Sequence, residues 1–298
     1  MQLPTQPSDS TMDNLRVYIR TQVRHCEDLP AIPRSVKTVT ALLGDINSSL
    51  DEIEASIVSD PCSAIRLIQM ANSAFYGSHQ VVMSIRRAIL LLGFDALKLL
   101  FSNVPLHDSF VRKNTSEIQV IDSISLHSLA VARLSQRIAK DVRQRVIEPD
   151  DAFCAGLLHD IGRSVLLHLF AKDYYQLLSR VDNDPERDLF QAETQTFEVT
   201  HTEVGRWFAE AWHLPVPIVQ TMAMHHHLST ENRLVMIVQL ADYIVSKERI
   251  GLVDGHDRTR NPGPLLRGLD LSTEQLKQYG RFIQSESDTW QLLKHHAA

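Results

Sequence analysis

The sequence lacks the features that define several special classes of protein. Its 3 cysteines are scattered among 298 residues without paired spacing, so we expect reduced thiols rather than a disulfide framework or a cysteine-based zinc site. The longest apolar stretches, at 88–92 and 165–170, are far shorter than the ~20 residues that a membrane-spanning helix needs. The composition therefore predicts no membrane span.

The balance of charge argues against a protein that binds nucleic acid. With 30 Lys and Arg against 36 Asp and Glu, the net charge is −6, which argues against direct binding to nucleic acid. The first 14 residues are polar and contain no apolar signal core. We therefore expect a cytoplasmic protein that makes no membrane contact.

The remaining composition is that of a globular protein with one unusual count. Hydrophobic residues make up 44% of the chain, which is enough for a full core in one large domain or two medium ones. Histidine occurs 14 times, about twice as often as an average composition would give. The positions of the histidines therefore need an explanation.

Local signals predict an all-α fold. No alternation of apolar and polar residues persists long enough to indicate a strand. Ser49 and Glu52 form a capping box, and Asp60 precedes Pro61 as at the start of a helix. Gly93 follows an apolar run and is expected to end a helix. These closely spaced signals predict short helices in a compact N-terminal bundle.

A polar segment at 107–121 separates these short helices from longer ones. Histidines and aspartates occupy positions on the apolar faces of the longer helices, where the pattern alone would place core residues. We expect the longer helices at 122–141, 151–169, 202–212, 217–226 and 233–250, and a last polar helix from Ser272. The inward residues are His127, His159, Asp160, His201, His225, His226 and Asp242.

Each inward residue also has an ordinary interpretation. A lone histidine on an apolar face is usually a hydrogen-bonded core residue, and a buried aspartate can be a cap or an ion-pair partner. Several helices that all direct such groups inward favour a shared metal site instead. Imidazole and carboxylate together suit Fe, Mn, Ni, Zn or Mg, and one aspartate can bridge two ions. The other histidines receive no metal role, with His227 left open.

One run of residues has a recognisable pattern. His159-Asp160-Ile161-Gly162, with His127 before it and Asp242 after it, resembles the HD superfamily of metal-dependent phosphohydrolases. The N-terminal half is similar to the HDOD family, the HD-related output domains of bacterial signalling proteins. The motifs that carry this similarity are Leu29 to Pro33, Asp60-Pro61, Ala71 to Gly77, Ser84-Ile85, Ala88-Ile89 and Leu91 to Gly93.

The resemblance implies an N-terminal helical bundle packed on an HD-like bundle. It divides the chain into an N-terminal helical extension (1–28), the N-terminal sub-bundle (29–112), the HD-like bundle (113–250) and a loop with a C-terminal helix (251–298). Within Ala71 to Gly77, the pair Phe75-Tyr76 either offers a contact surface or fills the seam between the bundles.

Metal ligands are as a rule incomplete in the HDOD family, but the resemblance implies that all seven inward residues are retained here. They match, in order, the ligand pattern of the related HD-GYP phosphodiesterases. The Gly-Tyr-Pro element of those enzymes is absent after His227, and Arg163 stands where they usually carry lysine. Arg163 could clamp a phosphate or form a surface ion pair.

Two functions follow as alternatives. The first is a signalling protein that acts through contacts with other signalling proteins in trans, with any bound metal structural. The second is a metal-dependent phosphohydrolase acting on a nucleotide or cyclic dinucleotide. In that enzyme the metals would activate a bridging water held by Asp160, and Arg163 would steady the phosphate.

Overall fold

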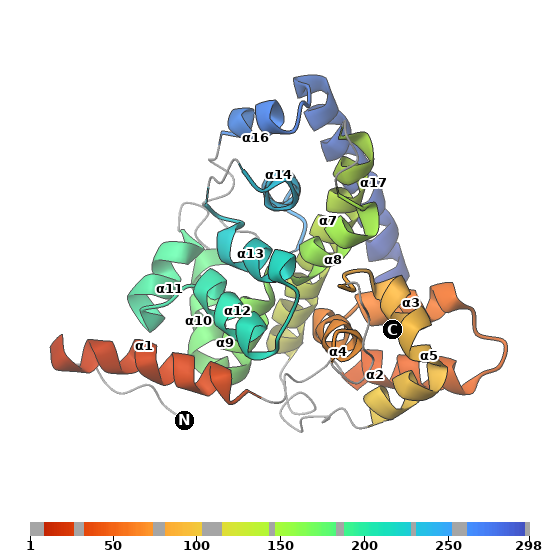
Figure 1. The fold of residues 1–298 in the computed structure, drawn as a ribbon. Helices are drawn as coiled ribbons and strands as arrows, with labels where there is room; N and C mark the ends of the chain where they lie inside the picture. Colours follow the sequence, from red (N-terminus) through yellow and green to blue (C-terminus); the bar gives the residue numbers. More distant parts are fainter. Residues whose placement is uncertain are drawn as a thin grey trace.

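The structure is a computed structural model that describes residues 9–26, 33–73, 81–102, 115–142, 147–182, 188–227, 231–251 and 261–295. Every regular element within these ranges is a helix, so the all-α prediction is confirmed (Figure 1). No helix among them combines the length and the apolar character needed to cross a membrane. The pair Phe75-Tyr76 and most of the polar segment at 107–121 lie outside the described residues.

Four helices of the N-terminal half pack on one another, in orange on the right of Figure 1. Two predicted helix starts are confirmed: Ser49 and Glu52 form the capping box, and Asp60 accepts from the backbone of Cys62. Gly93 has a φ of 74° and kinks the last of the four. The helices are α2 (Pro33–Gly44), α3 (Leu50–Val58), α4 (Pro61–Ala71) and α5 (Ile85–Ser102).

The second half of the chain forms a larger bundle, and α4 joins the first half to it through contacts with two of its helices, α8 and α9. The bundle consists of α7 (Thr115–Asp141), α8 (Pro149–Leu158), α9 (Ile161–Leu169), α12 (His201–Ala211), α13 (Val216–Met224) and α14 (Arg233–Lys247). Two helices, α10 (Ala171–Asp182) and α11 (Leu189–Phe197), connect α9 to α12. After α14 come α16 (Gly263–Gly268) and α17 (Thr273–His295), which pack against it.

The first helix, α1 (Asp9–Arg24), lies against α12 of the larger bundle and away from α2 to α5 (Figure 1). Arg16 donates to the backbone carbonyl of Glu198 at 3.1 Å and forms an ion pair with Glu203. The guanidinium of Arg16 also stands 5.3 Å from the ring centroid of Trp207. Since Glu203 completes the capping box of α12 with Thr200, α1 is attached to the start of that helix.

The prediction of one helix over 151–169 is wrong. The chain forms two helices, α8 and α9, and His159 and Asp160 lie in the turn between them. Asp160 has φ −101° and ψ 15°, outside the helical values. Consecutive side chains in one continuous helix would point about 100° apart, whereas the turn directs both of these side chains into the bundle.

Glycine allows two helix pairs to approach closely beside this turn. A Cβ atom on Gly162 would lie 1.9 Å from the carbonyl oxygen of His201, so α9 and α12 cross in backbone contact. A Cβ atom on Gly156 would lie 2.9 Å from the Cα atom of Ala132, which brings α8 against α7. The helix α12 carries His201 and α7 carries His127, so each crossing brings an inward histidine next to the turn at His159 and Asp160.

Candidate metal centre

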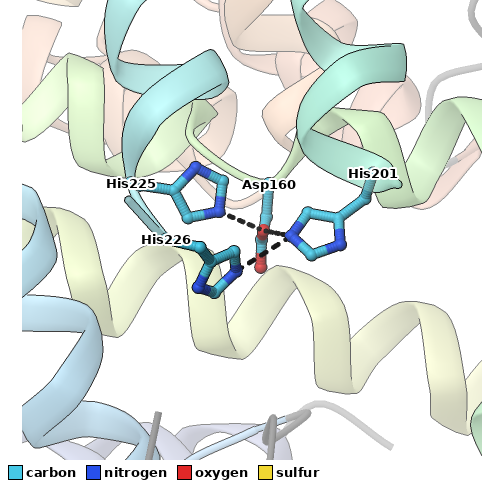
Figure 2. A group of neighbouring side chains, drawn as sticks. All are labelled: Asp160, His201, His225 and His226. Carbon is cyan, nitrogen blue, oxygen red and sulfur yellow. Dashed lines mark hydrogen bonds and ion pairs between the residues drawn. The ribbon is translucent and has the colours of Figure 1, made fainter. Parts of the chain in front are cut away.

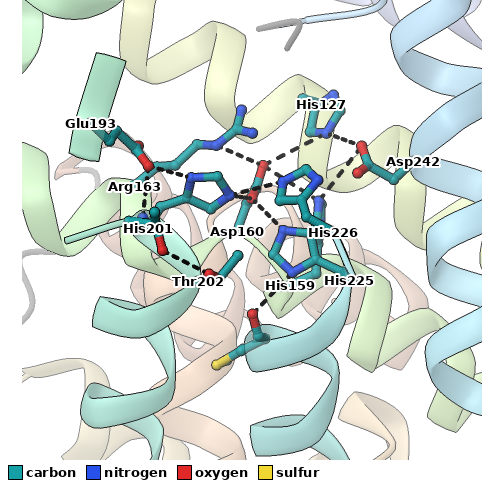
Figure 3. Close-up of polar contacts among 12 residues, drawn as sticks. His127, His159, Asp160, Arg163, Glu193, His201, Thr202, His225, His226 and Asp242 are labelled. Carbon is teal, nitrogen blue, oxygen red and sulfur yellow. Dashed lines mark hydrogen bonds and ion pairs between the residues drawn. The ribbon is translucent and has the colours of Figure 1, made fainter. Parts of the chain in front are cut away.

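All seven inward side chains that the sequence predicts converge at one place in the larger bundle; Figure 2 draws four of them and Figure 3 all seven. They come from α7, the α8–α9 turn, the start of α12, the residues after α13, and α14. Every one of them is buried, and His226 is the most exposed at 8%. The buried positions predicted for these residues are therefore confirmed.

Four of these residues form the first group, which Figure 2 shows. Each of them offers a nitrogen or oxygen atom, and these atoms lie within 4.8 Å of one another. The Oδ1 atom of Asp160 lies 3.4 Å from Nε2 of His201 and 3.3 Å from Nε2 of His225. The Nε2 atoms of His201 and His226 are 3.0 Å apart.

His127, His159 and Asp242 form the second group. The Nε2 atom of His127 lies 3.0 Å from Oδ1 of Asp242. The other oxygen of Asp160, Oδ2, faces this group at 3.4 Å from His159 and 3.7 Å from His127. Asp160 thus presents one carboxylate oxygen to each group.

The outer hydrogen bonds of two histidines determine which of their ring nitrogens faces the centre. The Nδ1 atom of His159 lies 2.7 Å from the carbonyl of Gly156, and that of His225 lies 3.0 Å from the carbonyl of Met222. A carbonyl oxygen can only accept, so these Nδ1 atoms carry the protons. The Nε2 lone pairs therefore point at the carboxylates, an arrangement suited to a cation between them.

Buried polar atoms that lack a hydrogen bond also indicate that the centre fits a metal ion. Among the described residues, Nε2 of His159, Oδ2 of Asp242 and both carboxylate oxygens of Asp160 are buried without a hydrogen bond of good geometry. Buried polar atoms of this kind are costly unless a partner satisfies them. Nitrogen and oxygen donors at these distances fit the chemistry of one or two divalent ions.

The protonation states agree with this arrangement. Burial lowers the pKa of His159 to about 3 and that of His201 well below its usual value. Burial alone would raise the pKa of Asp160, but the charge of Arg163 and the nearby imidazoles hold it well below its usual range. His159 and His201 are therefore neutral and Asp160 is ionised, the forms that bind metal. Burial alone would lower the pKa of His127, but its hydrogen bond to Asp242 raises it.

Arg163 lies inside this centre. Its side chain is buried, and Nε is 3.1 Å from Oδ2 of Asp160. Of the two roles considered for it, the surface ion pair is therefore wrong. A guanidinium at this position compensates part of the negative charge of Asp160.

Two neighbouring residues were not predicted as part of the site. Glu193 on α11 is fully buried and lies 2.7 Å from Nδ1 of His201 (Figure 3), and the hydroxyl of Tyr174 donates to it at 2.6 Å. The sequence contains a signal for Glu193, because it stands between Leu189 and Phe197 at four-residue spacing on one apolar face. No comparable signal distinguishes Tyr174 from a core aromatic residue.

Phe190, also on α11, covers one side of the centre. Its ring meets the rings of His201 and His226 edge-on, with centroids 6.2 and 5.9 Å apart. His227 is exposed outside the centre, and His213 ends the α12 segment with a φ of 52°. Five of the histidines are therefore buried members of the centre, and others lie outside it.

The fold and this centre define an all-helical protein with an HD-type arrangement of histidine and aspartate. The model of the HDOD domain matches residues 29–228, and the chain belongs to the HDOD family. The match covers most of the N-terminal half and the larger bundle as far as the histidine pair.

Solved structures with a similar fold come from signalling proteins and a virulence factor. A MmoQ response regulator of Methylococcus capsulatus superposes with a TM-score of 0.65 at 22% identity, covering 86% of this chain and 98% of that one. A virulence factor of Campylobacter jejuni superposes with a TM-score of 0.59 at 16% identity, covering 86% and 96%. At these identities the similarity establishes the fold.

A relative by sequence is an uncharacterized protein of Treponema pallidum. It is 24% identical over 205 residues, which cover 68% of this chain and 38% of the relative. The chain therefore spans well under half the length of this relative.

Proposed function

We propose that this protein is a signalling protein that acts through contacts with other signalling proteins, and that its HD-like bundle holds a structural divalent metal centre. The bundle would correspond to residues 113–250 and the N-terminal sub-bundle to 29–112. The observation that carries the proposal is the burial of the complete ligand set, with no member more than 8% exposed.

Burial matters because a phosphodiester must reach the metals to be hydrolysed. Phe190 covers the His201 and His226 side of the centre, and Arg163 is turned inward to Asp160 rather than outward to a ligand. Among the described residues, no member of the centre is more than 8% exposed, which favours an ion over a nucleotide as its occupant. A metal here would join five parts of the bundle and stabilise its fold.

The proposed ligands are the seven residues that converge, with Asp160 as the bridging carboxylate. Five imidazoles and two carboxylates favour Fe, Mn, Ni or Zn over Mg, which prefers a shell of oxygen ligands. The test is elemental analysis of protein purified without added metal or chelator. We expect at least one transition-metal ion per chain.

Matched variants make this test specific. His225→Gln and Asp160→Asn should lose the metal, whereas His227→Gln, which changes an exposed histidine two positions along, should retain it. A wild-type protein that contains no metal and takes up none would contradict the proposal.

The second candidate is a metal-dependent phosphohydrolase for a nucleotide or cyclic dinucleotide. One observation favours it: Asp160 presents one oxygen to each group of histidines, as a carboxylate between two ions would. Bound metals would supply Lewis-acid stabilisation of phosphate charge. Arg163 would then bind phosphate after turning away from Asp160.

Turnover distinguishes the two functions. We expect the metal-loaded protein to leave cyclic dinucleotides and bis(p-nitrophenyl) phosphate intact. Hydrolysis by the wild type that is lost in Asp160→Asn would establish the second candidate instead.

A further inference from the structure

The hydrogen-bond partner of Nδ1 in His201 differs from the partners of Nδ1 in His159 and His225. His159 and His225 donate from Nδ1 to neutral backbone carbonyls. The Nδ1 atom of His201 instead faces the carboxylate of Glu193 at 2.7 Å, and both side chains are fully buried.

Glu193 is itself held by donors on two sides. Its Oε2 atom accepts from Nδ1 and, at 2.8 Å, from the backbone nitrogen of His201. Its Oε1 atom accepts from the hydroxyl of Tyr174 at 2.6 Å. Three donors around one carboxylate favour its ionised form, which can only accept hydrogen bonds.

We propose that Glu193, oriented by Tyr174, is a positioning residue that fixes the proton of His201 on Nδ1 and turns a basic Nε2 towards Asp160. The Nε2 atom then lies 3.4 Å from Oδ1 of Asp160 and 3.0 Å from Nε2 of His226. In metal-free protein, His226 supplies the proton between the two rings.

The consequence for metal binding rests on the function proposed above. A charged acceptor on the outer nitrogen raises the basicity of a ligating imidazole more than a carbonyl does. Loss of such an outer partner typically weakens metal binding about 10- to 100-fold. Of the three histidines whose outer hydrogen bonds are described, His201 would thus be the strongest donor.

Glu193 also holds in place the two helices that connect α9 to α12. Tyr174 belongs to α10 and Glu193 to α11, so the pair ties both connecting helices to the first residue of α12. The buried ring of Tyr174 also packs on Phe197, with centroids 5.8 Å apart. The carboxylate therefore has a fixed position relative to His201.

The test uses two variants of similar size. Glu193→Met removes the acceptor, whereas Glu193→Gln keeps an oxygen that can accept from Nδ1 and from the backbone nitrogen. Nitrogen-15 spectra of histidine-labelled, metal-free protein report the tautomer of His201, with His201→Gln used for assignment. We expect the Nδ1-protonated tautomer in the wild type and in Glu193→Gln, and a shift towards Nε2 protonation in Glu193→Met.

Cobalt binding, followed by visible absorption, gives the second measurement. We expect the Co²⁺ dissociation constant to rise about 10- to 100-fold in Glu193→Met and less in Glu193→Gln. Glu210→Gln, on the exposed side of α12, should leave the constant unchanged. A purely structural role would destabilise both Glu193 variants without changing the tautomer, and this result would overturn the inference.

The two measurements separate the inference from the proposed metal centre. Nε2 protonation in wild-type His201 would overturn the inference whether or not Co²⁺ binds. The predicted tautomers without any Co²⁺ binding would support the positioning role and contradict the metal centre. Should Glu193→Met fail to fold, the wild-type tautomer and Tyr174→Phe, for which we expect a smaller loss of affinity, still decide the question.

Discussion

The Nε2 atoms of His201 and His226 face each other at 3.0 Å in the interior of the larger bundle. Two lone pairs at this distance repel, so either one ring carries a proton there or a cation accepts both. The ionised Asp160 beside His201 favours the cation. Metal occupancy should therefore change the stability of the whole bundle.

Removal of metal should lower the melting temperature. An ion present at 100 times its dissociation constant stabilises the native state by about 2.7 kcal/mol, which corresponds to a shift of about 4 °C for a chain of this size. Scanning calorimetry before and after treatment with a chelator measures the shift. Asp160→Asn is the control, and an equal shift in this variant would mean that the metal binds elsewhere.

Gly162→Ala should disrupt the crossing of α9 and α12. The new Cβ atom would lie 1.9 Å from the carbonyl oxygen of His201, and backbone must move to relieve this contact. We expect a loss of about 3 kcal/mol or more in the free energy of unfolding, measured with denaturant. Gly44→Ala, where a Cβ atom meets nothing within 4 Å, should be neutral or stabilising.

Arg16→Ala should loosen α1 from α12. The change removes an ion pair with Glu203 and a cation–π contact with Trp207, together about 1 to 2 kcal/mol for partly exposed groups. Hydrogen exchange should become faster in α1 and stay unchanged in α4. Arg206→Ala, which removes a guanidinium facing Glu210 on the exposed side of α12, serves as the control.

Acid should destabilise the metal-free protein through His159. Its pKa is about 3 in the folded state against 6.5 for an exposed histidine, so the unfolded state binds the extra proton between these values. The contribution of His159 to stability is present above pH 6.5 and is lost as the pH falls towards 3. Between pH 6 and 4, the free energy of unfolding should fall more steeply in wild type than in His159→Asn, by up to about 1.4 kcal/mol per pH unit.

The helical fold and the candidate ligands could be predicted because their signals are local. The Ser49 capping box and the Asp60-Pro61 start depend on neighbouring residues alone, and both are confirmed. The inward histidines stand out as polar residues on apolar faces, and all five are buried as that pattern predicts, although His159 lies in a turn rather than within a continuous helix. Periodicity within one helix therefore carries most of this information.

The remaining features depend on contacts between distant segments. The turn at His159 and Asp160 escaped prediction because the apolar pattern continues through it, while the crossing at Gly162 places both residues in one centre. The apolar face with Leu189 and Phe197 indicates that Glu193 is buried, but its role beside His201 exists only once α11 packs there. The attachment of α1 to α12 likewise joins positions that are far apart in the sequence.

The positions of the seven proposed ligands along the chain bear on how the protein would fold with a metal ion. They run from His127 on α7 to Asp242 on α14, so the centre is complete only when both ends of the larger bundle have met. An ion held there closes a long loop of chain, as a cross-link would, and its gain in stability comes at the last step of assembly. Metal content then distinguishes finished molecules from partly folded ones, and unfolding should begin with release of the ion.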